Sequence, residues 1–224
     1  MRLDEEYRLS EYVDLGRLDD NEKVHIVRNK VNGVIGVRKY IALDLEEIYL
    51  FLKENPNPYI PKIYECIQTN TNLIVIEEYL SGKNLEEILK EKIFSEKDAA
   101  DIIICLCNAL YPLHNAKMPV ICRDLKAENV ILTNEGEVKL IDFDIARIYQ
   151  PGKSKDTVMM GTQGYAAPEQ FGFGQTDART DIYALGVLLN YMLVRDFPME
   201  KLTEGKFKTI VLKCTKINPE DRYQ

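Results

Sequence analysis

Residues 120–132 read VICRDLKAENVIL, and this stretch decides how the rest of the sequence is interpreted. The apolar residues at its two ends, 120–121 and 130–132, are typical of short buried strands. Between them the chain carries charged and amide side chains, which are costly to bury without hydrogen-bond partners. These are Arg123, Asp124, Lys126, Glu128 and Asn129. We therefore expect the apolar ends to hold a polar loop whose side chains meet partners of their own.

The composition is that of a folded protein with a sizeable core. The chain has 224 residues, of which 46% are hydrophobic, and a net charge of -7 with a pI near 5.1. This acidity argues against binding to nucleic acid or to an anionic membrane, because both need clustered Lys and Arg. The five cysteines are odd in number and share no metal-ligand spacing, which favours reduced thiols. Since no apolar run reaches about 20 residues and the start MRLDEEYRLSEY is acidic, we expect a soluble, cytoplasmic protein.

The first part of the chain reads as an antiparallel sheet. Apolar residues alternate on both sides of the turn NKVNG, which predicts a β-hairpin over residues 23–43. Two further strands are expected at 62–69 and 72–80, and residues 45–53 follow helical periodicity. Residues 1–80 are therefore predicted to form a β-rich, nucleotide-binding lobe with one inserted helix.

The second part of the chain reads as mainly helical. Helices are expected at 84–92, 95–116 and 180–194, and Asn84 and Ser95 are the N-cap candidates of the first two. Short strands flank the turn TNEG, and a long irregular stretch, rich in Gly, Thr and Gln, follows them. The sequence therefore predicts an α-rich lobe over residues 81–224, and an α+β fold for the whole chain.

Oxygen ligands gather around the polar loop in a pattern that suits magnesium. Asp124 and Asn129 lie in the loop itself, and Asp142 ends an apolar strand further along the chain. Carboxylate and amide oxygens are the ligands that Mg²⁺ prefers when phosphates supply the rest of its shell. Lys126 would add a positive charge beside a phosphoryl group. These residues together predict a site for a phosphorylated ligand and a metal ion.

Three motifs, in this order, resemble the eukaryotic-type serine/threonine protein kinase family: CRDLKAEN, DFD and GTQGYAAPE. They are similar to its catalytic loop, its metal-binding turn and the end of its activation segment. The resemblance implies a bilobal fold, with a small antiparallel β-sheet lobe that carries one helix and a larger, mainly α-helical lobe. It also implies transfer of the γ-phosphoryl group of ATP, with Mg²⁺, to a Ser or Thr hydroxyl of a protein substrate.

The resemblance assigns a role to each polar residue of the loop. Asp124 would accept or orient the proton of the substrate hydroxyl, and Lys126 would steady the γ-phosphate. Asn129 and Asp142 would hold Mg²⁺. Lys126 and Thr162 also resemble the serine/threonine members of the family. We therefore predict Asp124, Lys126 and Asn129 as catalytic residues.

The same resemblance suggests how the loop is supported. Asp181 resembles a buried aspartate that accepts hydrogen bonds from the backbone of the catalytic loop. Glu169 and Arg222 resemble a buried ion pair that ties the activation segment to the late part of the larger lobe. His25 and His114 lie in strand and helix patterns, and we interpret both as packing residues.

The phosphate anchor of the first lobe is expected in the segment GVRKYI. Strand alternation allows either Arg38 or Lys39 to face the nucleotide, and we favour Lys39 because a compact ammonium suits the phosphates. By resemblance its partner is a glutamate of the inserted helix, with Glu47 preferred and Glu46 as the alternative. Gly16 is the one glycine kept from the phosphate-covering loop.

The segment LIVIEEYL resembles the strand that leads into the adenine-binding hinge. Glu78, Tyr79 and Leu80 would offer backbone groups to adenine. Glu77 would then occupy a position that is usually apolar in the family. A carboxylate at this place needs a partner.

The sequence departs from the family in several places. Asp19, Asp20 and Glu22 stand where bare backbone usually closes over phosphates, and anions there repel a triphosphate. The end of the chain is short for a substrate-docking helix and a closing helix. These departures leave open a pseudokinase that senses nucleotide or serves as a scaffold. A kinase of small molecules is a weaker alternative, because GTQGYAAPE resembles a peptide-positioning segment.

Phosphorylation sites are suggested by position alone. Arg123 directly precedes Asp124, and by resemblance such an arginine pairs with a phosphorylated residue of the activation segment. The candidates are Ser154 and Thr157, which lie beside two lysines.

Overall fold

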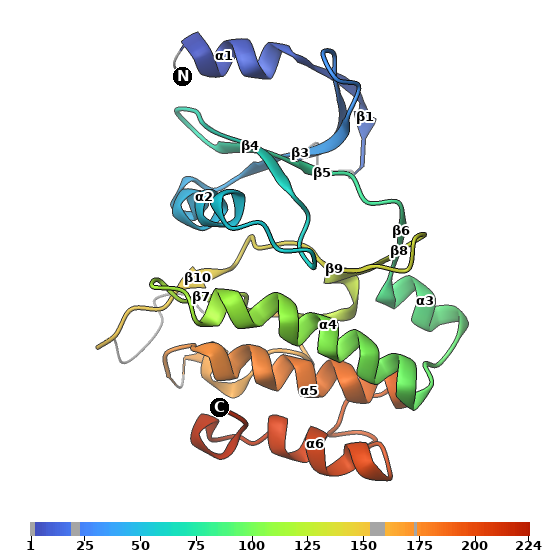
Figure 1. The fold of residues 1–224 in the computed structure, drawn as a ribbon. Coiled ribbons are helices and arrows are strands. Elements are labelled where there is room, and N and C mark those ends of the chain that lie inside the picture. Colours follow the sequence, from blue (N-terminus) through green and yellow to red (C-terminus); the bar gives the residue numbers. More distant parts are fainter. Residues whose placement is uncertain (1–2, 19–22, 153–159, 173) are drawn as a thin grey trace. The chain divides into compact units, whose positions relative to one another are not determined.

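The computed structural model describes residues 3–18, 23–152, 160–172 and 174–224 (Figure 1). The chain divides into two compact units, Met1–Ser81 and Gly82–Gln224. The first unit is built on an antiparallel sheet and the second is mainly helical, so the chain has an α+β fold. No helix of the described parts is long and apolar enough to cross a membrane.

A five-stranded antiparallel sheet forms the body of the first unit, in the order β1-β2-β3-β5-β4. Its strands are β1 (Tyr12–Arg17), β2 (Val24–Asn29), β3 (Ile35–Ile41), β4 (Ile63–Gln68) and β5 (Leu73–Glu78). The predicted hairpin is confirmed as β2 and β3. In its turn the side chain of Asn29 accepts hydrogen bonds from the backbone N–H groups of Val31 and Asn32, which fixes the reversal.

The core of the first unit is centred on β5 and on a helix that packs beside the neighbouring strand β4. β5 is flanked by strands on both sides, and Leu73, Val75 and Ile76 are fully buried. The short 3₁₀ helix η1 (Leu43–Leu45) leads into α2 (Glu46–Glu54), the predicted inserted helix. α2 packs beside β4 and buries Ile48 and Leu52, a spacing of one helical turn.

Sequence analysis missed the helix α1 (Leu3–Ser10). Its apolar residues Leu3 and Tyr7 lie one helical turn apart but are exposed, and its buried residue is Glu5, so this helix is not held to the core by an apolar stripe. A polar contact attaches it to the sheet: the Arg8 guanidinium donates to the Glu65 carboxylate of β4 at 2.7 Å.

The second unit contains the helices α3 (Leu85–Glu91), α4 (Glu96–His114), α5 (Ala178–Val194) and α6 (Lys206–Cys214). Both predicted N-caps are confirmed. The Asn84 side chain accepts from the backbone N–H of Glu87, and the Ser95 hydroxyl accepts from that of Asp98. These bonds satisfy backbone donors that the first turn leaves unpaired, and so determine where α3 and α4 begin.

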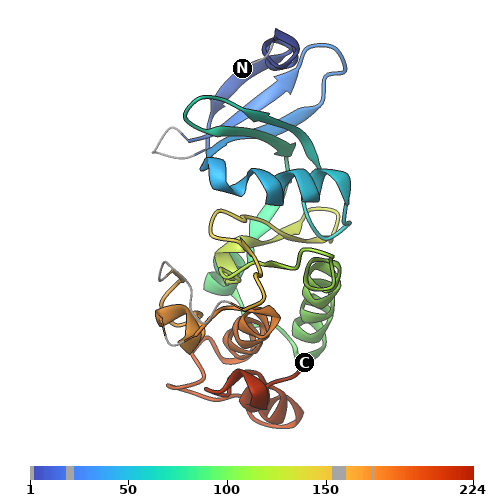
Figure 2. The same cartoon turned by 90° about the vertical axis from the view of Figure 1, so that its left-hand side faces the viewer.

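α5 lies between α4 and α6 in the core of the second unit (Figure 2). Gly186 allows the close approach of α6, because a Cβ added there would lie 2.3 Å from the Cβ of Cys214. α6 was not predicted, since the end of the chain was expected to be short of helix. Its buried residues Phe207, Val211 and Cys214 are spaced four and three apart, a helical pattern present in the sequence.

Short strands hold the polar loop at both ends. β7 (Val120–Ile121) pairs with β10 (Arg147–Ile148), and β8 (Val130–Thr133) lies between β6 (Gly82–Asn84) and β9 (Val138–Leu140). The predicted strands at both ends of the loop are therefore confirmed, and they belong to different sheets. The described part of this unit also contains the 3₁₀ turns η2 (Ala127–Asn129), η3 (Pro168–Phe171) and η4 (Pro219–Asp221).

Candidate active site

Asp181 holds the first half of the polar loop by its backbone. Its carboxylate is fully buried in the first turn of α5 and accepts from the N–H groups of Cys122 and Arg123, each at 2.9 Å. Arg123 itself adopts a left-handed φ of 69°, which turns the chain sharply before Asp124. The predicted support of the loop by Asp181 is thus confirmed.

His114 has a role that sequence analysis did not assign. Its Nε2 lies 2.7 Å from the Asp181 carboxylate, so it joins the end of α4 to the support of the loop. His114 is mostly buried, as the packing interpretation expected, and the contact with Asp181 adds a polar partner that this interpretation lacked. Cys122, the residue before Arg123, is buried beside Asp181. This burial raises the pKa of its thiol well above the ordinary value, so Cys122 acts as a neutral packing group.

Three polar side chains surround the carboxylate of Asp124. The Thr162 hydroxyl donates to Oδ1 of Asp124 at 2.6 Å, and Nζ of Lys126 lies 2.9 Å from Oδ2. Lys126 also donates to the Thr162 hydroxyl at 3.0 Å. Nδ2 of Asn129 donates to the Asp124 carboxylate at 3.1 Å and to its carbonyl at 2.9 Å. The structure therefore brings Asp124, Lys126 and Asn129 together, with Thr162 from the distant activation segment.

Asp142 follows β9 at the edge of this cluster. The backbone N–H of Ile141 donates to the carbonyl of Asn129 at 2.8 Å, which ties the start of the DFD turn to the loop. Asp142 has a left-handed φ of 68°, and its carboxylate accepts from the N–H of Asp144 at 3.0 Å. This bond forms a tight turn that presents the Asp142 carboxylate beyond the strand.

The orientation of Asn129 fits a magnesium ligand. Its amide nitrogen is directed at Asp124, so its amide oxygen points to the other side, where it can accept a cation. In the part of the chain that the structure describes, no group of three or more His, Cys, Asp and Glu residues could hold a metal alone. A divalent ion held by Asn129 and Asp142 would therefore need oxygen ligands from bound phosphates or water, as Mg²⁺ usually does.

Gln170 is a buried site residue that sequence analysis missed. Its side-chain nitrogen donates to the carbonyls of Arg123 at 2.7 Å and Met160 at 2.8 Å. Its side-chain oxygen accepts from the N–H of Ala167 at 3.0 Å. One carboxamide thus links the polar loop to two points of the activation segment. Its place directly after the APE motif is the only signal in the sequence, and it indicates no such role.

The predicted ion pair between Glu169 and Arg222 is confirmed. The guanidinium donates to both carboxylate oxygens, at 2.6 and 2.9 Å, and the Arg222 side chain is 0% exposed. Its remaining donors reach the carbonyls of Arg179, Lys216 and Ile217. The Thr180 hydroxyl donates to the same glutamate at 2.8 Å. The end of the activation segment is therefore fixed to α5 and to the last turn of the chain.

In the first unit, Lys39 and Arg38 point to opposite faces of the sheet. Nζ of Lys39 lies 2.6 Å from the Glu77 carboxylate of β5. Arg38 pairs instead with Asp14 of β1, and the same carboxylate lies 2.7 Å from Nδ1 of His25. His25 packs edge-on against the Tyr40 ring, as the packing interpretation expected, and it also has a polar partner in Asp14.

The structure also gives the positions of the other residues that were predicted to bind the nucleotide. Glu47 is exposed on α2, so the carboxylate that the structure sets against Lys39 is Glu77 and not the glutamate inferred by resemblance. Gly16 lies in β1, at a bulge where its N–H donates to the Asp14 side chain. Glu78 ends β5, where its N–H donates to the carbonyl of Lys62, and Leu80 follows half-buried.

Several predicted residues lie outside the described parts of the chain. They are the three acidic residues of the phosphate-covering loop and the two candidate phosphorylation sites, namely Asp19, Asp20, Glu22, Ser154 and Thr157. The acidic loop and the phosphorylation hypothesis therefore remain predictions.

Comparison with known proteins identifies a matching family and several relatives of this chain. A family described as protein kinase domain matches residues 24–223. The probable serine/threonine-protein kinase PknB of Corynebacterium glutamicum is 38% identical over 130 residues, which are 56% of this chain and 20% of the relative. The probable serine/threonine-protein kinase PBL8 of Arabidopsis thaliana is 32% identical over 208 residues, 88% of this chain and 50% of the relative.

A third relative is the mouse serine/threonine-protein kinase PAK 1. It is 32% identical over 171 residues, which are 76% of this chain and 31% of the relative. The chain thus spans half or less of the length of each of these relatives.

Proposed function

Because the chain belongs to the protein kinase family, we propose that it transfers the γ-phosphoryl group of ATP to a serine or threonine hydroxyl of a protein. The observation that carries this proposal is the cluster around Asp124. Its carboxylate is hydrogen-bonded by a hydroxyl, an ammonium and an amide within 3.1 Å, so its position is fixed before any substrate arrives. Such preorganisation is what a residue that orients a nucleophile requires.

Asp124 is the proposed acceptor of the substrate proton. The Thr162 hydroxyl, which donates to Oδ1, shows that this carboxylate accepts a hydrogen bond from an alcohol at 2.6 Å. A substrate hydroxyl bound in the same way would lose its proton to Asp124 as its oxygen bonds to the γ-phosphorus. The bond from that phosphorus to the bridging oxygen then breaks, and ADP leaves with the electron pair.

Lys126 is the proposed electrostatic stabiliser of the transferring group. Its ammonium lies against both Asp124 and Thr162, so it stands next to the place where a substrate hydroxyl would meet the γ-phosphate. A fixed positive charge there stabilises the negative charge on the phosphoryl oxygens in the transition state. Asn129 and Asp142 would hold Mg²⁺, which neutralises the phosphates when it is bound.

The first unit is proposed to bind the nucleotide. Lys39 would contact the phosphates, the backbone of Glu78 and Leu80 would meet adenine, and Gly16 belongs to the strand that leads toward the phosphate-covering loop. Val37 is buried on the same face as Lys39, which supports an apolar contact with the base.

The proposal is tested first by binding and then by transfer. We expect MgATP to raise the melting temperature of the whole chain more than ATP with EDTA does. Radiolabel should then pass from ATP to a serine-containing protein with the wild-type chain but not with Asp124→Asn or Asp142→Asn. Asp101→Asn, the same chemical change at an exposed position of α4, serves as the control and should keep full activity.

The alternative of a nucleotide-sensing pseudokinase predicts a different pair of results. Stabilisation by MgATP without any transfer would support a sensor. Absence of both would support a scaffold. Stabilisation together with transfer that depends on Asp124 supports the kinase.

A further inference from the structure

Lys39 and Glu77 meet on one face of the sheet because of the register between β3 and β5. In this register Lys39 lies opposite Val75, and Val37 lies opposite Glu77. Residues directly opposite in an antiparallel pair share a face, so Lys39 and Glu77 are diagonal neighbours on that face. Their charged atoms lie 2.6 Å apart, a short charge-assisted contact.

The surroundings of this pair make it strong. The Lys39 and Glu77 side chains are 14% and 9% exposed, against 31% and 17% for Lys53 and Glu65, another ion pair of the same unit. The neighbours opposite them, Val37 and Val75, are buried and apolar. Water therefore screens this pair less than an exposed one, and separating the two charges is correspondingly costly.

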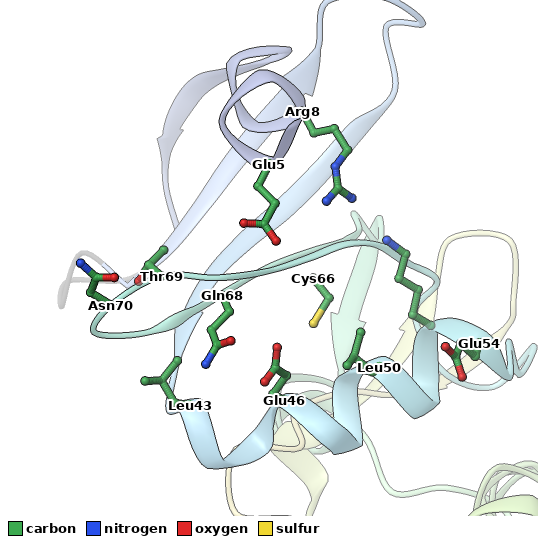
Figure 3. Close-up of a pocket in the computed structure, with 11 residues that line it drawn as sticks. Glu5, Arg8, Leu43, Glu46, Leu50, Glu54, Cys66, Gln68, Thr69 and Asn70 are labelled. Atoms are coloured by element: carbon green, nitrogen blue, oxygen red, sulfur yellow. The ribbon is translucent and has the colours of Figure 1, made fainter. Parts of the chain in front are cut away.

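The two glutamates of α2 are placed elsewhere. Glu47 is exposed. Glu46 points into a polar pocket of 1040 Å³ within the first unit, toward Cys66 and Gln68 (Figure 3). Burial together with the nearby Glu46 carboxylate raises the pKa of the Cys66 thiol to about 11, even though Lys53 opposes the shift. Glu46 therefore lines this pocket, and the carboxylate paired with Lys39 is that of Glu77.

We propose that Glu77, and not a glutamate of α2, is the residue that positions Lys39 for the phosphates of ATP. The inference rests on the proposed function, in which Lys39 is the phosphate anchor. Because both residues of the pair belong to adjacent strands, the anchor is oriented by the sheet itself. A displacement of α2 would then leave Lys39 in place. Glu77 acts through Lys39 and is a positioning residue rather than a catalytic one.

The first test compares three matched glutamate variants in the whole chain. Glu77→Gln is expected to raise the KM for ATP about tenfold, the usual effect of losing one charge-assisted hydrogen bond, with a smaller change in kcat. Glu46→Gln and Glu47→Gln should stay within about twofold of wild type. Glu77→Asp keeps the charge and should restore part of the affinity. A larger rise in KM for either α2 variant than for Glu77→Gln would overturn the proposal.

A second measurement needs no nucleotide and separates this inference from the proposed function. Acylating reagents react with neutral amines, so an ammonium held by a carboxylate is protected. Labelling of the protein without nucleotide, read by peptide mass spectrometry, should be several times faster at Lys39 in Glu77→Gln than in wild type. The exposed Lys62 is the internal reference and should not change.

The outcomes of the two tests are distinguishable. If the wild-type chain neither binds nor uses ATP, the proposed function fails and labelling alone decides whether Glu77 holds Lys39. Unchanged labelling of Lys39 in Glu77→Gln, with the chain folded, would refute the positioning role. If Glu77→Gln does not fold, Glu77→Met, which removes the carboxylate and places an apolar side chain there, is compared with Glu47→Gln, and equal labelling of Lys39 in these two variants would refute the positioning role.

Discussion

Replacement of Arg222 by methionine is expected to be among the most destabilising changes in the second unit. The substitution keeps a long apolar side chain but removes every donor that Arg222 provides. Glu169 would lose contacts of 2.6 and 2.9 Å, and three carbonyls would lose their donor as well. A carboxylate left buried without its partner typically costs about 3–5 kcal/mol.

The magnitude can be translated into a melting temperature. For a chain of this size, each kcal/mol lowers the midpoint by about 2–4 °C, so the expected shift is roughly 10 °C. Urea unfolding followed by far-UV circular dichroism measures the free energy directly. Circular dichroism is preferred because the chain has no tryptophan to report unfolding by fluorescence.

Two further variants make this prediction specific. Arg179→Gln removes a neighbouring arginine whose pairs with Asp177 and Glu220 are partly exposed, and it should cost about 1 kcal/mol or less. The double variant Glu169→Gln with Arg222→Met should be less destabilised than the sum of the two single changes, because it leaves no buried charge. If Arg222→Met costs no more than Arg179→Gln, the reasoning about the buried pair is refuted.

Three other predictions concern the activation segment and the first unit. Gly164→Ala should destabilise the chain by about 1–3 kcal/mol in urea unfolding, because the new Cβ would lie 2.5 Å from the Phe197 ring at a φ of +89°; Phe197→Ala in the same chain should reduce this additional cost, and a full cost there would contradict the clash. Gln170→Leu should lower the rate of phosphoryl transfer more than the affinity for ATP, since it releases the carbonyl of Arg123 beside the catalytic loop; equal losses in both would refute this role. Alkylation of Cys66 by iodoacetamide should be slower than that of free cysteine at pH 8 and keep rising with pH toward about 11, because a raised pKa leaves less thiolate at a given pH; a plateau below pH 9 would show that its thiol is not shifted.

The secondary structure around the candidate site could largely be predicted from the sequence, because local signals determine it. Asn84 and Ser95 form their caps with residues three positions away, and the NKVNG turn is held by its own first asparagine. Such contacts depend only on neighbouring residues. The buried α5 was equally accessible, since most of its residues from 182 to 194 are apolar.

The partners of the charged residues could not be predicted in the same way. Glu46, Glu47 and Glu77 are all carboxylates near Lys39 in the expected fold, and only the register of β3 against β5 decides which one meets the ammonium. Helix α1 was missed for a related reason, since a contact between Arg8 and the distant Glu65 attaches it to the sheet. These choices depend on tertiary geometry, which a single sequence does not state.

The residues that contact Asp124 and support its loop all lie in the second unit of the chain. Lys126, Asn129, Thr162 and Asp181 all belong to residues 82–224, whereas the Lys39 pair lies wholly within residues 1–81. On the proposed function, substitutions within residues 1–81 can therefore change nucleotide binding without removing the hydrogen bonds around Asp124. A lineage that carries such a chain is free to diversify the two properties separately.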